Sequence, residues 1–319
     1  MTLNFRTAQR TTPLSRPLRR FANPDVVSEG WYAVGAASAI RRGKVVSVSV
    51  GRHDLILYRD LTGVLRAADR ACPHLGADLG MATVVDKGLR CAFHQWCWDP
   101  GGQCIAGGGA ACGAQLRTYQ VRERWGLAWV WAGGTPAYDL PMPETGNRRH
   151  LLRLPPQRLT CHGHVVLGNG LDLTHVVPVH GFRFVDDPIV ETDSAHRISV
   201  RVHARFEPTP MRRLLGVAGR TARWQFTNIG PSLAWVNVSA PTPFELLWAA
   251  RPLPDGSCIT QTLFFLPRWS ALARAVPMMI ATTWADRQVL NGLRFHPGFV
   301  ASDAVFARYA HLVEDLPEW

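Results

Sequence analysis

Two short stretches, Cys72-Pro73-His74 and Cys91-Ala92-Phe93-His94, decide how this chain is interpreted. Each stretch places one thiol and one imidazole on a tight turn. A [2Fe–2S] cluster can be held by two thiolates on one iron and two imidazoles on the other, which raises its reduction potential above that of an all-cysteine cluster. We therefore expect Cys72 and Cys91 to bind a buried iron, and His74 and His94 to bind an outer one.

The same four residues are also a possible structural zinc set, because zinc binds Cys₂His₂ sites. Zinc fingers usually pair Cys with Cys and His with His, whereas each turn here mixes the two. With the flanking Leu75-Gly76 and Trp96, the motifs resemble those of the Rieske proteins. Ala77 and Phe93 stand where respiratory Rieske proteins carry a disulfide between the cluster loops. The resemblance is therefore to the oxygenase or ferredoxin type.

A second motif, residues 169–180, reads Asn169-Gly-Leu-Asp172-Leu-Thr-His175-Val-Val-Pro178-Val-His180. On a helix Asp172 and His175 share a face, and Pro178 would stop the regular helix so that His180 turns back towards His175. Two histidines and one carboxylate form the facial triad that leaves positions of a non-haem Fe(II) open to O₂. Buried structural histidines are the alternative.

The order of these motifs, the cluster pair followed by Asn-x-x-Asp-x-x-His-x₄-His, resembles the catalytic (alpha) subunit of the Rieske non-haem iron oxygenases. The resemblance implies that His175 and His180 bind a mononuclear Fe(II). It also implies that Asp172 lies between a cluster histidine of one subunit and an iron-ligand histidine of the next. Asn169 would lie near the iron. The alternatives are that Asp172 serves the helix dipole and that Asn169 caps the helix.

The third iron ligand is expected from a later helix. Residues 278–295 have helical periodicity, with Ile280, Trp284, Val289 and Leu293 as apolar markers. Asp286 lies within this segment, and the resemblance implies that the last ligand is an Asp of a C-terminal helix. A solvated acid, or an ion pair with Arg287, is the alternative. The competing carboxylates, in a more polar terminal segment, are Asp303, Glu314 and Asp315.

Composition places the chain among soluble globular proteins, with 319 residues, 47% hydrophobic and 18% charged. No apolar run is long enough to span a membrane, and the basic residues 1–20 lack the apolar region of a secretory signal. Only Lys44 and Lys87 are lysines, a skew typical of bacterial GC-rich genes, and we expect a bacterial cytoplasmic protein. The net charge of +11 would attract an acidic electron-transfer partner. No nucleic-acid-binding motif is present.

The predicted fold class is α+β. We expect a basic arm, either loose or oligomer-clasping, over residues 1–24, and an all-β Rieske [2Fe–2S] domain over 25–136. Residues 137–319 would form the catalytic domain, which the resemblance implies is a helix-grip (START-like) fold with an antiparallel sheet. Alternating patterns predict its strands. These strands are Arg197–Phe206, Ala222–Thr227, Leu233–Val238 and Gln261–Phe265.

The resemblance implies the terminal oxygenase of a multicomponent system that works as a homotrimer. NAD(P)H would supply electrons through a separate reductase, with or without a ferredoxin, and O₂ would be the co-substrate. The expected reaction is monooxygenation (hydroxylation, demethylation or N-oxygenation) of a hydrophobic aromatic, heterocyclic or polycyclic compound. Dihydroxylation, desaturation and oxidative cyclisation are the alternative reactions. A Rieske electron carrier with a ligand-binding domain and a zinc-stapled binding protein are alternatives of other classes.

Overall fold

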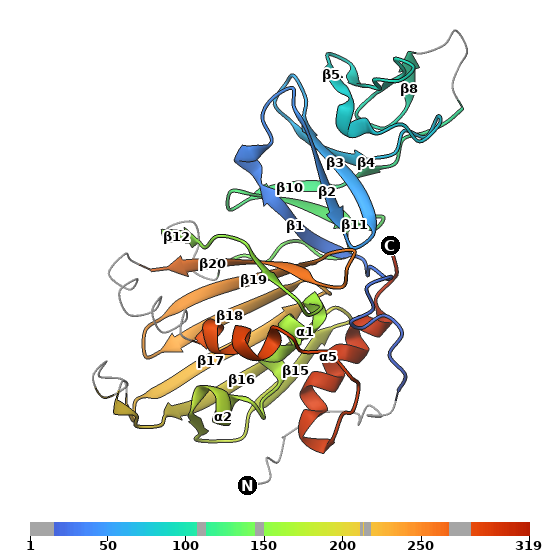
Figure 1. Cartoon of the computed structure of the whole chain (residues 1–319). Helices are drawn as coiled ribbons and strands as arrows, with labels where there is room; N and C mark the ends of the chain where they lie inside the picture. The colour runs from blue at the N-terminus through green and yellow to red at the C-terminus, as the bar shows by residue number, and fades with distance from the viewer. Residues whose placement is uncertain (1–15, 107–112, 144–149, 211–212, 214–217, 268–281) are drawn as a thin grey trace. The chain divides into compact units, whose positions relative to one another are not determined.

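The computed structural model describes residues 16–106, 113–143, 150–210, 213, 218–267 and 282–319. The chain forms two compact units, seen in Figure 1. The small unit comprises residues 24–139 together with 253–255 and 318–319. The large unit holds the rest of the described residues, including residues 16–23. No helix among the described residues is long and apolar enough to cross a membrane.

The small unit consists of three antiparallel sheets. One contains β1 (Gly30–Ala36), β11 (Leu127–Ala132) and β10 (Val121–Arg124). The second contains β2 (Val45–Val50), β3 (His53–Arg59), β4 (Leu65–Asp69) and β9 (Thr118–Tyr119). The third contains β5 (Thr83–Val85), β6 (Gly88–Arg90), β7 (Cys97–Trp98) and β8 (Cys104–Ala106). Two short 3₁₀ turns, η1 (Ala37–Ala39) and η2 (Leu79–Met81), link them.

Strand β3 separates two cores of the small unit. Successive side chains of a strand point to opposite faces. Leu55 and Leu57 therefore pack into one hydrophobic cluster, whereas Ile56 and Tyr58 pack into the other. The second cluster also contains Cys72 and Cys91, so the thiols of the two motifs are anchored in a packed interior.

The large unit is built on an antiparallel nine-stranded sheet. Its main path runs β12 (His150–Arg153), β20 (Cys258–Leu266), β19 (Phe244–Pro252), β18 (Leu233–Ala240), β17 (Thr221–Ile229), β16 (Arg197–Phe206) and β14 (Phe182–Phe184). Beside this path, β13 (Gln157–Leu159) pairs with β20 and β15 (Ile189–Ser194) pairs with β16. The four predicted strands are all present. Strand β19 was missed because it is buried on both faces and so has no polar alternation.

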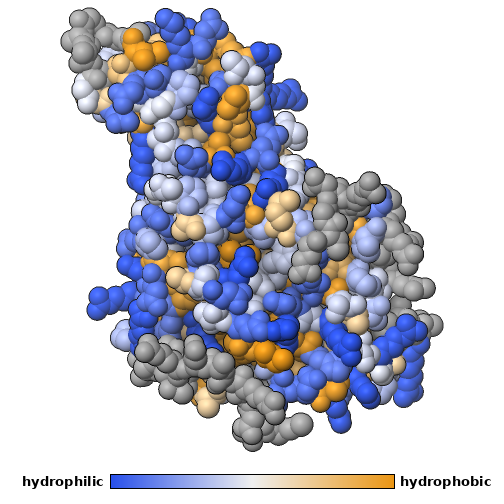
Figure 2. Space-filling model, turned by 180° about the vertical axis from the view of Figure 1, so that it is seen from behind, coloured by the Kyte–Doolittle hydropathy of each residue, from blue (hydrophilic) through white to orange (hydrophobic). Residues whose placement is uncertain are grey.

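Helices cover one face of this sheet (Figure 1). They are α1 (Gly163–Gly168), η3 (Asn169–Leu171), α2 (Val176–His180), the helical residues 282–290, η5 (Ala301–Asp303) and α5 (Ala304–Asp315). Side chains of α1 and α5, such as Val166 and Tyr309, share one core with inward strand residues such as Val200 and Val236. On the face of the molecule in Figure 2, hydrophilic residues predominate and hydrophobic ones form separate small patches.

The described part of the N-terminal arm is bound to its own chain. The Glu314 carboxylate accepts the backbone N–H groups of Arg19 (2.9 Å), Arg20 (2.7 Å) and Phe21 (2.6 Å). The Arg20 guanidinium donates to the carbonyls of Glu314 and Leu316. The sequence predicted a loose or oligomer-clasping arm, but residues 16–23 form a strap along α5 of their own chain.

Two local predictions in the large unit were wrong. Asp172 and His175 do not share a helix face, because a turn from Asp172 to His175 separates η3 from α2. Pro178 does not end a helix either. It occupies the first turn of α2, where its missing N–H has no intrahelical partner to lose. Gly181, in the left-handed conformation at φ 56°, ends the helix instead.

Candidate functional site

The two cysteine–histidine loops have the same backbone geometry. In one, the N–H of Cys72 donates to the carbonyl of Ala77, and the N–H of Gly76 donates back to the carbonyl of Cys72, each at 2.8 Å. In the other, Cys91 and Trp96 are joined at 2.8 Å, and the N–H of Gln95 donates to the carbonyl of Cys91 at 3.1 Å. Gly76 and Gln95 occupy matching left-handed positions, with φ of 75° and 60°.

This geometry buries the thiols and leaves the imidazoles outermost. Cys72 and Cys91 are each 2% exposed, whereas His74 is half-buried and His94 is exposed. The two imidazole rings lie 4.7 Å apart, and His74 stacks on Trp96 at 3.9 Å. The thiol of Cys72 interacts with that of Cys91, and burial raises the pKa of Cys72. Two buried thiols with two imidazoles outside them are the mixed donor set of a [2Fe–2S] cluster, so these residues fit such a cluster.

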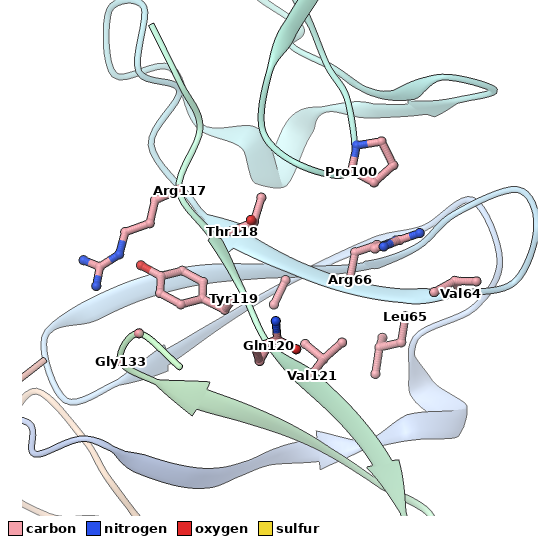
Figure 3. Close-up of a pocket in the computed structure, with 12 residues that line it drawn as sticks. Val64, Leu65, Arg66, Pro100, Arg117, Thr118, Tyr119, Gln120, Val121 and Gly133 are labelled. Atoms are coloured by element: carbon pink, nitrogen blue, oxygen red, sulfur yellow. The ribbon is translucent and has the colours of Figure 1, made fainter. Parts of the chain in front are cut away.

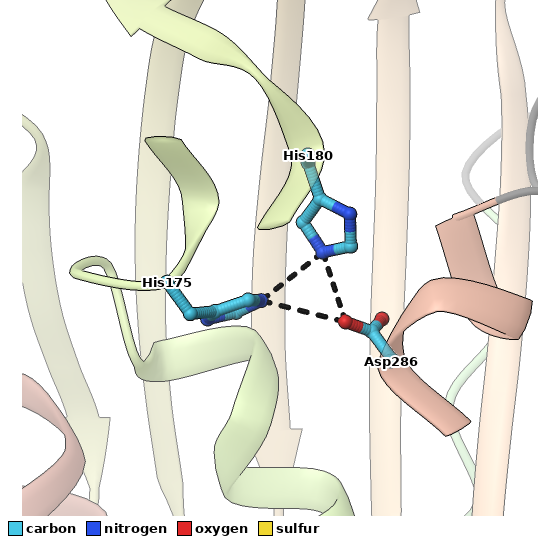
Figure 4. A group of neighbouring side chains, drawn as sticks. All are labelled: His175, His180 and Asp286. Carbon is cyan, nitrogen blue, oxygen red and sulfur yellow. Dashed lines mark hydrogen bonds and ion pairs between the residues drawn. The ribbon is translucent and has the colours of Figure 1, made fainter. Parts of the chain in front are cut away.

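The second candidate site joins both ends of α2 to the helical residues 282–290. His175 precedes α2 and His180 ends it, while Asp286 reaches them from the later helix (Figure 4). The Nε2 atoms of His175 and His180 lie 3.1 Å apart. Oδ1 of Asp286 lies 2.9 Å from Nε2 of His180 and 3.6 Å from Nε2 of His175. Among the described residues, this is the one His, Cys, Asp and Glu group that converges closely enough to hold a metal ion.

Hydrogen bonding assigns the tautomer of His175. Its Nδ1–H donates to the backbone carbonyl of Asp172 at 2.5 Å, so its Nε2 presents a lone pair to the centre of the triad. Oδ1 of Asp286 is buried, and both imidazoles face it. Two imidazole nitrogens and one carboxylate oxygen that converge in this way are a donor set that a divalent metal ion satisfies, so these residues fit a mononuclear iron.

The electrostatics of the triad agree with this interpretation. Burial would raise the pKa of Asp286, but the imidazoles of His175 and His180 outweigh it and lower the pKa to about 2. Burial opposes the charged form of His175, yet the Asp286 carboxylate raises its pKa overall. The three side chains thus stabilise one another as an ionic group, and a metal ion would displace the Nε2 proton that His175 carries in its charged form.

Asp172 and Asn169 both contact His175. The carboxylate of Asp172 is 3.7 Å from Nδ1 of His175, so the carbonyl of this residue, rather than its carboxylate, holds the imidazole. Oδ1 of Asp172 instead accepts the backbone N–H (3.0 Å) and the hydroxyl (2.5 Å) of Thr174. The amide of Asn169 lies 3.4 Å from Nε2 of His175, beside the triad. Sequence analysis overlooked Thr174.

The competing carboxylates lie elsewhere. Asp303 accepts the N–H of Val300 at the start of η5, Glu314 holds the strap, and Asp315 pairs with Arg16 at 2.6 Å. The predicted helix is present over the described residues 282–290, but two of its apolar markers, Trp284 and Val289, are 62% and 54% exposed. Its inward face carries Asp286 and Leu290 instead, and Ile280 lies outside the described residues.

A group of aromatic side chains lies beside His180 of the triad. The ring of Phe182 lies 6.5 Å from that of His180, 4.7 Å from that of Phe206 and 5.2 Å from that of Trp224. A separate groove of about 530 Å³ lies on the small unit, lined by residues of β4, β9 and β10 such as Arg66 and Tyr119 (Figure 3). It contains none of the candidate site residues.

Comparison with known proteins identifies the small unit. Residues 30–120 match the family described as the Rieske [2Fe–2S] domain. The chain contains a Rieske domain. This match decides between the cluster and zinc, and it confirms the predicted [2Fe–2S] cofactor.

Relatives of known activity are similar over different parts of the chain. Cholesterol 7-desaturase nvd of Bombyx mori is 29% identical over 51% of this chain and 38% of its own length. This desaturase and two further relatives are matched over only 31–55% of their own length, so the chain spans about half of these proteins or less. Aminopyrrolnitrin oxygenase PrnD of Pseudomonas fluorescens is 25% identical over 93% of this chain and 92% of its own.

A likeness to a solved structure covers both units. The crystal structure of dicamba monooxygenase with non-haem iron and dicamba has a TM-score of 0.62, at 20% identity, over 91% of this chain and 97% of that one. The Rieske-bearing chain thus has the fold of the Rieske oxygenases. The predicted resemblance to the Rieske non-haem iron oxygenases and the predicted α+β fold class are confirmed.

Proposed function

We propose that this chain is the terminal oxygenase component of a Rieske system. Cys72, His74, Cys91 and His94 would hold the [2Fe–2S] cluster, and His175, His180 and Asp286 would hold a mononuclear Fe(II). The convergence of two imidazole Nε2 atoms and one unprotonated carboxylate oxygen carries this proposal. Bound iron would supply the redox chemistry for reducing O₂, and the electrons would come from NAD(P)H through a reductase and, in some systems, a ferredoxin.

The proposal includes a homotrimer. Leu75 and Phe93, which flank the cluster histidines, are 69% and 63% exposed, an apolar surface that a second copy could cover. The Asp172 side chain is 34% exposed, and Thr174 donates to its Oδ1 but not to its Oδ2. We place this oxygen as the acceptor for a cluster-ligand imidazole of the neighbouring copy. A trimer found by light scattering and broken by Phe93→Glu would support this; a wild-type monomer would contradict it.

The proposed reaction is monooxygenation of a hydrophobic ring compound. Phe182, Phe206 and Trp224 give the side of the triad next to His180 an aromatic, uncharged character. The name of the relative matched over most of its length, aminopyrrolnitrin oxygenase, supports an aromatic or heterocyclic substrate. We also propose a cytoplasmic location in a bacterium, on the arginine-rich composition.

Desaturation is the second candidate reaction, because the cholesterol 7-desaturases of Bombyx mori and Drosophila melanogaster are among the relatives. Incubation with ¹⁸O₂, NADH, a Rieske reductase and a panel of aromatic amines, aryl ethers and sterols distinguishes the reactions. Monooxygenation places one labelled oxygen in the product or in the departing carbon, dihydroxylation places two, and desaturation places none. Iron that never exceeds the cluster content would overturn the oxygenase proposal in favour of an electron carrier.

A further inference from the structure

We infer that Thr174 is a positioning residue for the proposed iron site, acting on His175 through Asp172; this inference rests on the proposed function. Thr174 lies in the turn between η3 and α2. Both its backbone N–H and its hydroxyl donate to the same oxygen, Oδ1 of Asp172, at 3.0 and 2.5 Å. Hydrogen bonds to an ionised carboxylate are stronger than those between neutral groups. The turn is therefore closed by a two-point clamp.

The clamp matters because Asp172 holds His175 through its main chain. The carbonyl of Asp172 accepts the Nδ1–H of His175 at 2.5 Å. Asp172 itself is extended, with ψ of 92°, so regular helical hydrogen bonding does not fix the direction of this carbonyl. Anchoring the side chain of Asp172 restrains its backbone, and the carbonyl then sets both the tautomer and the ring orientation of His175. Mutation of a group that orients a metal ligand in this way typically weakens metal binding by about 10- to 100-fold.

The clamp also selects between the two oxygens of the Asp172 carboxylate. Oδ1 is engaged by Thr174, whereas Oδ2 lies 3.7 Å from Nδ1 of His175 on a partly exposed side chain. Without the hydroxyl of Thr174, the carboxylate could rotate and compete with the carbonyl for the His175 proton. Thr174 thus keeps the two acceptors of Asp172 in separate roles.

The test measures Fe(II) affinity of the cluster-containing protein, under anaerobic conditions, by competition with a chromogenic chelator. Thr174→Val removes the hydroxyl at nearly constant volume and should weaken Fe(II) binding about tenfold. Thr174→Ser keeps the hydroxyl and should bind within about twofold of wild type. Thr192→Val makes the same chemical change on the exposed part of β15 and should bind Fe(II) as wild type does.

Thermal unfolding of the metal-free variants provides a second readout. If Thr174 only stabilises the fold, Thr174→Val should have a lower unfolding temperature but an unchanged Fe(II) affinity. That result would overturn the inference. Should Thr174→Val fail to fold, Thr174→Ala removes the same hydroxyl with less bulk and carries the same expectation.

A double substitution tests whether the effect passes through Asp172. In an Asp172→Ala background, Thr174→Val should cause no further loss of affinity, because its partner is gone. A second tenfold loss in that background would overturn the inference. If wild type itself binds no Fe(II) while its cluster is intact, the proposed function fails. If wild type and Thr174→Val bind Fe(II) equally, only the role of Thr174 fails.

Discussion

The two candidate metal sites are assembled over very different distances along the chain. Each cluster loop is closed within itself, by hydrogen bonds between Cys72 and Ala77 and between Cys91 and Trp96. The triad instead needs Asp286 to reach His175 and His180 from a distant helix packed on the same sheet. A site built from short loops depends on local backbone geometry, whereas a site built across a sheet depends on the stability of the whole unit. The two sites should therefore fail separately.

The largest expected effect is loss of the cluster in Cys72→Ala. A buried thiolate ligand cannot be replaced by a methyl group, so the visible absorption of the cluster should disappear completely. Fe(II) bound at the triad should stay close to one ion per chain, because neither His175 nor Asp286 lies in the small unit. Metal analysis together with absorption spectroscopy measures both. Loss of the triad iron as well would show that the two sites do not fail separately.

The reciprocal change, Asp286→Ala, should weaken Fe(II) binding at least about a hundredfold. Removing a ligand itself should lower the affinity more than removing a group that only orients a ligand. The cluster absorption should be unchanged. Asp303→Ala and Asp315→Ala are matched controls, because these carboxylates are engaged elsewhere. Stoichiometric iron in Asp286→Ala, or iron lost in either control, would show that the third ligand is another carboxylate.

The same contrast explains what could be predicted from the sequence. The proposed cluster ligands could be chosen from the sequence because Cys72, His74, Cys91 and His94 lie within two turns, and four strands of the large unit were predicted from their sequence patterns. Asp286 could be proposed by resemblance, but its neighbours misled, because Trp284 and Val289 are apolar yet exposed. A hydrophobic pattern cannot show which helix face meets a site that buries a carboxylate.

The turn at Asp172 was missed for a different reason. The three-residue spacing of Asp172 and His175 suggested a helix, but Asp and Thr side chains compete for backbone groups and stabilise turns instead. The N-terminal strap was also unpredictable. Nothing within residues 16–23 indicates that three of their N–H groups converge on Glu314 at the other end of the chain.

Removing the strap contact should destabilise the large unit selectively. In Glu314→Gln, one carboxylate oxygen becomes an NH₂ group that faces backbone donors, so we expect a loss of about 2 kcal/mol in the free energy of unfolding. Tryptophan fluorescence in urea should report this loss, and the cluster absorption of the small unit should bleach at an unchanged urea concentration. Asp315→Asn, next to it on an exposed ion pair, is the control and should change stability by less than about 0.5 kcal/mol. An equal loss in both variants would argue against the strap.

The stability of the large unit should also depend on pH, through a buried histidine. Burial lowers the pKa of His162 to about 4, from an ordinary value of 6.5. A histidine held neutral in the folded state contributes full stability above its unfolded pKa, and this contribution falls as the pH drops from 6.5 towards 4. Between about pH 7 and pH 5 the metal-free protein should lose about 2 kcal/mol through this group.

His162→Asn isolates that contribution. Nδ1 of His162 accepts the N–H of His164 at the start of α1, a capping role that Asn can take over without titrating. Urea unfolding of wild type and variant at both pH values gives the difference. The variant should show a pH dependence about 2 kcal/mol flatter over this range. Parallel pH profiles would mean that His162 is not held neutral in the fold.

The smallest effect comes from exchanging residues between the two cluster loops. Gly76 and Gln95 hold matching left-handed positions, yet only glycine adopts that conformation without strain. A Cβ added at Gly76 would meet no atom within 4 Å, so Gly76→Gln should cost about 1 kcal/mol through backbone strain alone. Gln95→Gly should gain about 0.5 kcal/mol, less than the reverse, because it also loses the bond from Gln95 to the carbonyl of Ala92. Bleaching of the cluster in urea measures both changes. If both variants gained stability, or both lost it, the two loops would not be equivalent.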